Sequence, residues 1–150
     1  MQLTVLILAI VAYSVSTLTF YLTPGHTAGT ISTLIPVKDG GTPHVAIQMG
    51  GSSFSWLGRL EMITPTRPSS WWFETYSASA RRLRDIAAKA GADVVIGNHP
   101  IFDGSEAKLA AMATRKPGGP HPYVIGADSV KRYFTVADEC AKAGALRIPG

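Results

Sequence analysis

Two strand-like runs in this chain each end at a histidine that lies in a turn bounded by glycine or proline. The apolar run 18–22 stops at a Pro-Gly pair and is followed by His26, and the run 93–96 stops at Gly-Asn and is followed by His99. A strand fixes the position of its last residues, and the loop beyond it leaves an imidazole free to reach a metal ion. The pattern therefore predicts a sheet with two histidines that converge at one edge.

Further strand signals surround the first histidine. The runs 31–37 and 44–49 are apolar and flank an Asp-Gly dipeptide at Asp39, which favours a tight hairpin. Together with the run 18–22 they predict an antiparallel β-meander. Gly25 and Gly29 are expected to let the loop around His26 turn sharply and to leave space beside its imidazole.

Helical periodicity dominates the second half of the chain. Apolar spacing predicts helices over 77–90, 103–113 and 126–143, with Gly91 and Gly144 as the stops of the first and last helix. Asp128 is the predicted N-cap of the last helix. Four aromatic residues are expected to precede the first helix, where they either wall a hydrophobic substrate pocket or lock a loop onto the core: Trp71, Trp72, Phe73 and Tyr76. Strands first, then helices around one more strand, indicate an α/β fold with helices on one face of the sheet.

Two of these segments resemble a known family. The run 23–32, which contains His26, resembles the third metal-binding motif of the metallo-β-lactamase fold. The run 92–104, which contains His99, is similar to the late histidine motif of class B3-like members. The resemblance covers roughly residues 18–144, and it implies the C-terminal half of the αββα sandwich of that family: a β-meander followed by helix, strand, helix and helix.

The resemblance assigns a metal-ligand role to two residues. It implies that His26 and His99 are ligands of zinc, the cofactor of the family. It implies hydrolysis by a metal-activated water that attacks a β-lactam, a lactone or another ester or amide. The upstream His-x-His-x-Asp-His motif of the family is not found before His26, because the 25 residues there contain no His and no Asp. We therefore expect an incomplete chain, and the catalytic residues cannot be named.

Three further residues are candidates for supporting roles near the metal ligands. Asp103 either accepts a hydrogen bond from a ring nitrogen of His99 or only caps the following helix. Ser32 is expected to form hydrogen bonds near the metal loop. His121 lies in a rigid Pro-His-Pro segment, and either reaches the pocket or is a plain loop histidine.

The uncharged N-terminal stretch and the cysteine count bear on where the protein is located. No charged side chain precedes Lys38, and residues 3–22 are an uncharged apolar stretch. The segment 1–16 is a secretory signal, a membrane anchor or one or two buried strands, and residues 17–150 are the metallo-β-lactamase-like domain. The first two alternatives predict a secreted or membrane-associated protein. The only cysteine, Cys140, excludes an intrachain disulfide.

The charge pattern narrows the functional alternatives. The net charge of +4 comes from scattered Lys and Arg residues without interleaved aromatic residues, which argues against a nucleic-acid partner. The favoured function is a zinc-dependent hydrolase acting on a small-molecule substrate. The alternative is a catalytically inactive family member that serves as a binding or scaffold module. Self-association is expected if half of a sandwich leaves apolar surface exposed.

Overall fold

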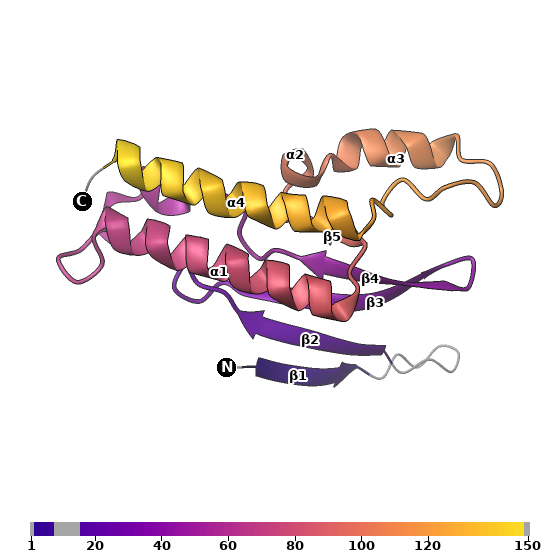
Figure 1. Ribbon diagram of the computed structural model, residues 1–150, viewed down its shortest axis with the longest axis horizontal. Helices are drawn as coiled ribbons and strands as arrows, with labels where there is room; N and C mark the ends of the chain where they lie inside the picture. The colour runs from indigo at the N-terminus through magenta and orange to yellow at the C-terminus, as the bar shows by residue number, and fades with distance from the viewer. Residues whose placement is uncertain (1, 8–15, 149–150) are drawn as a thin grey trace.

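Five strands form one mixed sheet in the order β1-β2-β3-β4-β5 (Figure 1). The computed structural model describes residues 2–7 and 16–148 of the chain. The first four strands pair as antiparallel neighbours, and β5 pairs with β4 in parallel. The meander predicted from the sequence is therefore present. The strands are β1 (Gln2–Ile7), β2 (Ser16–Leu22), β3 (Ile31–Asp39), β4 (Thr42–Gln48) and β5 (Val94–Ile96).

Two long helices lie side by side against one face of the sheet (Figure 1). They are α1 (Ser69–Ala90) and α4 (Ala127–Arg147). Within residues 2–7 and 16–148 no helix has the length and the apolar character needed to cross a membrane. The short helices are η1 (Ser55–Gly58), η2 (Leu60–Met62), α2 (Pro100–Asp103) and α3 (Ser105–Ala113).

The core lies between the sheet and these two helices. Ile47 of β4 and Val95 of β5 contribute apolar side chains from the sheet, and both are buried. Leu83 of α1 and Phe134 of α4 are fully buried opposite them. Burial of aliphatic and aromatic side chains of this size contributes about 1.5–3 kcal/mol each, so this layer holds the helices on the sheet.

Helix α1 begins at Ser69, not at residue 77 as predicted. The aromatic cluster therefore lies inside the helix, where Trp72 and Phe73 pack on the buried Trp56 of η1. Aromatic residues have modest intrinsic helix propensity, and tertiary packing overrides that preference here. The predicted stop is confirmed, because Gly91 caps the helix in the left-handed conformation at φ 66°.

The last helix begins within one residue of its predicted start, but its predicted N-cap and its predicted stop are wrong. Its N-cap is Gly126, and Asp128 lies in the first turn instead. Gly144 does not stop the helix, which continues to Arg147. A Cβ atom at position 144 would lie 2.2 Å from Cε1 of Phe73. Gly144 is therefore a packing position that lets α4 approach α1 closely.

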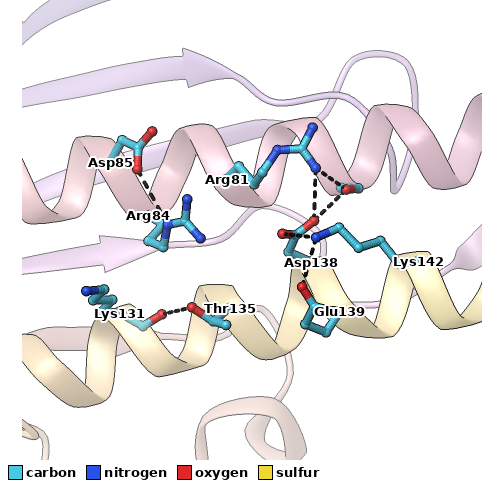
Figure 2. Close-up of polar contacts among 9 residues, drawn as sticks. Arg81, Arg84, Asp85, Lys131, Thr135, Asp138, Glu139 and Lys142 are labelled. Carbon is cyan, nitrogen blue, oxygen red and sulfur yellow. Dashed lines mark hydrogen bonds and ion pairs between the residues drawn. The ribbon is translucent and has the colours of Figure 1, made fainter.

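A buried carboxylate links the two long helices (Figure 2). Asp138 of α4 accepts hydrogen bonds from Ser77 Oγ (2.5 Å) and Arg81 Nη1 (3.1 Å) of α1, and from Lys142 Nζ (2.9 Å) of its own helix. Burial raises the pKa of Asp138, but the hydrogen bonds from Ser77 and Lys142 and the positive charges of Lys142 and Arg81 outweigh it, and the pKa lies below its usual value. Asp138 is therefore held ionised between the helices.

Part of the predicted segment 1–16 belongs to the sheet. Gln2–Ile7 forms the edge strand β1, paired with β2 from Gln2↔Tyr21 to Ile7↔Ser16. Residues 1 and 8–15 of the segment lie outside the described residues. Secretion or membrane anchoring through this segment stays a prediction.

Candidate functional site

The strand directions bring three loops to one edge of the sheet. Strand β3 is antiparallel to both β2 and β4, and β5 is parallel to β4. Strands β2, β4 and β5 therefore run in the same direction, and their last residues, Leu22, Gln48 and Ile96, lie at the same edge (Figure 1). His26 and His99 follow β2 and β5, and two glycines, Gly50 and Gly51, follow β4.

Hydrogen bonds from α1 and η1 tie the loop that carries His26 to the helical layer. The carbonyl of Pro24 accepts a hydrogen bond from Ser79 Oγ of α1 (2.6 Å), and the carbonyl of Gly25 accepts one from the buried indole of Trp56 (2.8 Å). Gly25 has a φ of 136° and packs on Tyr76, so a side chain at position 25 would be both strained and in collision. The backbone before His26 is therefore rigidly placed.

The imidazole of His26 is oriented by a backbone acceptor. Its Nδ1 lies 2.8 Å from the carbonyl oxygen of Ser53 and 3.4 Å from Ser53 Oγ. A carbonyl can only accept, so Nδ1 carries the proton and Nε2 is the nitrogen left with a lone pair. A hydrogen bond of this kind, made by the other ring nitrogen, is how proteins orient metal-binding histidines.

Gly51, not Gly29, provides the space beside this imidazole. A Cβ atom at position 51 would lie 2.1 Å from Cβ and 2.2 Å from Cγ of His26, whereas one at position 29 would meet no atom within 4 Å. The ring therefore packs directly on the backbone of the Gly50–Gly51 turn.

Ser32 holds the Gly50–Gly51 turn in place through a hydrogen bond. It is fully buried on β3, where its Oγ accepts a hydrogen bond from the N–H of Gly50 (3.1 Å) and lies 2.7 Å from Thr23 Oγ1. It links the base of the His26 loop to the Gly50–Gly51 turn. A role for Ser32 beside a bound metal stays a prediction.

The loop that carries His99 reaches the same turn. Asn98 Nδ2 donates to the carbonyl of Gly50 at 3.4 Å, and His99 is the exposed N-cap residue of α2. The imidazole of His99 faces the ring of Phe102 at a centroid distance of 6.0 Å. The structure therefore brings the two histidine loops together at Gly50 and Gly51, one on each residue of the turn.

Asp103 caps a helix and shows no hydrogen bond to a histidine within the described residues. Its Oδ2 accepts from the N–H of Gly97 (2.8 Å), and its Oδ1 accepts from the N–H (2.9 Å) and the hydroxyl (2.5 Å) of Ser105, the first residue of α3. Partial burial raises the pKa of Asp103, but these hydrogen bonds and the charge of Lys108 outweigh it and hold the pKa below its usual value. The single helix predicted over 103–113 is instead α2 and α3, broken at Gly104, whose φ is 70°.

His121 and His44 lie at the opposite edge of the sheet. Both line a cavity of about 590 Å³ with Asp39, at the β3–β4 hairpin. The length of β3, roughly 26 Å for nine residues, separates this edge from the His26 loop. His44 Nδ1 is engaged by Asp93 Oδ2 (2.5 Å), and His121 Nδ1 accepts from the N–H of Tyr123 (3.2 Å). His121 therefore does not join His26 and His99.

The residues present do not complete a zinc site. Catalytic zinc usually has three protein ligands, and residues 2–7 and 16–148 contain no group of three His, Cys, Asp or Glu side chains that could hold a metal ion. Among the described residues, His26 and His99 supply two imidazoles at this edge of the sheet.

Sequence reasoning missed Gly51 and Ser53, which position His26, and the contact that Asn98 makes with Gly50. Ser53, Gly51 and Asn98 all act through contacts with segments distant in the chain, which no local pattern reveals. One signal was available: Gly50 and Gly51 directly follow an apolar strand, where a close approach of another backbone is typical.

Comparisons with known proteins agree on the fold. No family model and no curated protein matches the chain. Among solved structures, the subclass B3 metallo-β-lactamase of Bradyrhizobium japonicum is 23% identical, with a TM-score of 0.62 over 91% of this chain and 47% of that chain. The native metallo-β-lactamase of Legionella gormanii is 21% identical, with a TM-score of 0.66 over 91% of this chain and 48% of that chain. A class B3 di-zinc metallo-β-lactamase from an Alaskan soil metagenome is 14% identical, with a TM-score of 0.56 over 89% of this chain and 46% of that chain.

The chain has a partial metallo-β-lactamase fold, as the sequence motifs predicted. It spans less than half the length of the solved structures that it matches. At these identities the likeness shows the fold alone.

Proposed function

We propose that this chain contributes two zinc ligands, His26 and His99, to a hydrolase site of the metallo-β-lactamase type. The observation that carries the proposal is the meeting of both histidine loops on the Gly50–Gly51 turn at one edge of the sheet. The orientation of His26 by the Ser53 carbonyl supports it, because Nε2 is left as the coordinating nitrogen. Fold likeness to class B3 metallo-β-lactamases adds support.

The proposed substrate is a small molecule with a hydrolysable carbonyl, such as a β-lactam, a lactone or another ester or amide. Two imidazoles are fewer than the three ligands that catalytic zinc usually has. A working site therefore needs ligands beyond this pair, and the contribution of the described chain is limited to holding two of them in place. The fold likeness to class B3 metallo-β-lactamases does not favour the alternative of an inactive scaffold module.

Zinc titration of the purified chain tests the proposal. We expect weak, sub-stoichiometric binding, because water has to fill the remaining coordination positions. His26→Ala and His99→Ala should each reduce that binding, measured by isothermal titration calorimetry and by metal retained after dialysis. His121→Ala is the matched control, since this histidine lies at the opposite edge of the sheet and its loss should leave zinc binding unchanged.

The same variants separate the possible outcomes. Zinc binding that is lost with His121→Ala but kept with His26→Ala would refute the proposal. Tight one-to-one zinc would show that a third ligand had been overlooked. With zinc supplied, we expect no measurable hydrolysis of β-lactams or lactones by the chain alone, because activation of water requires a complete zinc site. Turnover that depends on zinc and on His26 would show that the chain holds a complete site.

A further inference from the structure

A groove of about 560 Å³ lies beside the candidate site, between the segment 49–54, helix α2 and helix α4. We refer to it as the α2–α4 groove. Its volume is in the range of pockets that bind small organic molecules. None of the described residues that line it carries a charged side chain: they are Met49, Ser52, Ser53, Phe54, Tyr76, Ile101, Phe102, Tyr133, Val136, Ala137 and Cys140.

Two lining residues of the groove, Ser53 and Phe102, neighbour the histidines. At one wall Ser53 holds the imidazole of His26 through its carbonyl. At the other wall Phe102 faces the imidazole of His99. A molecule bound at the two histidine loops would therefore have the groove beside it.

The hydroxyl groups of the groove are engaged within the protein. Tyr133 Oη lies 3.3 Å from Ser52 Oγ, and Tyr76 Oη donates to Met49 Sδ at 3.9 Å. Burial raises the pKa of both tyrosines, so neither supplies a charge at neutral pH. The floor of the groove thus offers apolar surface and internally satisfied hydroxyls.

The rim of the groove exposes apolar side chains to solvent. Ile101 of α2 is 85% exposed and Val136 of α4 is 60% exposed. Exposed aliphatic residues that border an uncharged cavity are typical of a ligand-binding surface. They would lose contact with water when an apolar group enters between them.

We propose that the α2–α4 groove binds the uncharged aliphatic or aryl arm of the substrate whose carbonyl lies at His26 and His99. This inference rests on the proposed function for the position of the reacting group. It goes further by stating the substrate class: a carbonyl compound with an apolar arm, in preference to one with a charged arm, because no side chain of the groove can pair with a charge.

Cys140 allows the groove to be tested without zinc. It lines the groove, its side chain is exposed, and it is the only cysteine of the chain. Its alkylation by N-ethylmaleimide in zinc-free buffer reports whether the groove is occupied. The probe is 2-octanone, an uncharged ketone with an aliphatic arm, and acetone at the same concentration is the control ligand.

Occupancy of the groove by 2-octanone should slow the alkylation of Cys140 by N-ethylmaleimide, whereas acetone should leave the rate unchanged. At ten times its Kd, 2-octanone should lower the rate roughly tenfold by mass action. Val136→Asp places a carboxylate at the rim and should weaken protection by about an order of magnitude. Ala143→Asp adds the same charge to α4 outside the groove and should leave protection unchanged, and circular dichroism verifies that both variants are folded.

Absence of protection in the folded wild-type chain would overturn the proposal, and so would protection that Val136→Asp does not weaken. The zinc titration distinguishes this failure from failure of the proposed function. Zinc bound through His26 and His99 without protection would refute the groove alone. Protection without such zinc binding would refute the metal site and leave the apolar binding chemistry of the groove standing.

Discussion

The position of the His26 imidazole depends on a glycine far from it in sequence. Gly51 packs on the ring so closely that one added carbon atom would overlap it. The Ser53 carbonyl then fixes which ring nitrogen is free. A histidine that is only half-buried is in this way held in one orientation.

Gly51→Ala should therefore displace the imidazole. We expect the free energy of unfolding to fall by about 1–3 kcal/mol, as for other overpacked sites, and the residual zinc affinity to fall with it. Urea denaturation and zinc titration measure the two effects. Gly29→Ala is the matched control in the His26 loop, because an added Cβ there meets no atom within 4 Å. Equal effects of both substitutions would contradict the packing argument.

At the residue scale, the sequence identified the two histidines but not what holds them. His26 and His99 each follow a recognisable strand, so their common edge follows from strand direction. Ser53 and Asn98 act across 27 and 48 residues of chain, respectively. Contacts at that separation depend on the path of the whole chain, and no local pattern encodes them.

At the scale of elements, the pairing of α1 and α4 depends on the buried Asp138. Asp138 is 2% exposed, and its carboxylate accepts hydrogen bonds from both helices (Figure 2). Its cationic partners are about half exposed, so the link combines a buried acceptor with solvated donors.

Asp138→Asn should lower the free energy of unfolding by about 2 kcal/mol at pH 7. The pKa of Asp138 is lowered in the folded chain, so its contribution is complete above the unfolded value of about 3.9 and is lost as pH falls through the folded value. The difference between wild type and variant should therefore shrink below about pH 4. Urea denaturation at a series of pH values measures it.

Glu139→Gln is the control for this prediction. Glu139 also pairs with Lys142, but its side chain is 62% exposed. Surface ion pairs contribute about 0–1 kcal/mol, so this variant should change stability little. A difference between wild type and Asp138→Asn that stays constant down to pH 2 would show that the carboxylate charge is not the cause.

Element ends were harder to predict than element types. The predicted strands and both predicted long helices exist, but α1 starts earlier because its aromatic residues are buried against Trp56. On its own, Gly144 predicts a helix stop. It nevertheless lies inside α4, because the Phe73 ring occupies the space that a side chain at position 144 would need. In both cases tertiary packing overrides a local preference.

At the scale of the whole molecule, the two faces of the sheet differ. Leu34, Ile47 and Val95 pair across the sheet and face the helices. Their neighbours alternate to the other face, where Leu22 and Ile31 are 36% and 50% exposed. The second face of the sheet is thus apolar at β2 and β3.

A chain that starts at Thr17 should self-associate. It loses β1, so the backbone of β2 becomes an open edge beside this apolar face. Size-exclusion chromatography with light scattering would show oligomers, whereas Ile31→Lys in the same shortened chain should reduce them. A stable monomer at micromolar concentration would contradict the prediction.

The parallel pairing of β5 with β4 has a kinetic consequence. Strands β2, β3 and β4 are joined by short connections, but Ala46 meets Val94 only after the whole of α1 has been folded back. Non-local contacts of this kind close more slowly than hairpins, which form in about 1–10 μs. We expect pulse-labelled hydrogen exchange during refolding to protect the amides of β3 and β4 before those of β5. The two histidine loops would then form one after the other, the His26 loop early and the His99 loop in one of the last steps of folding.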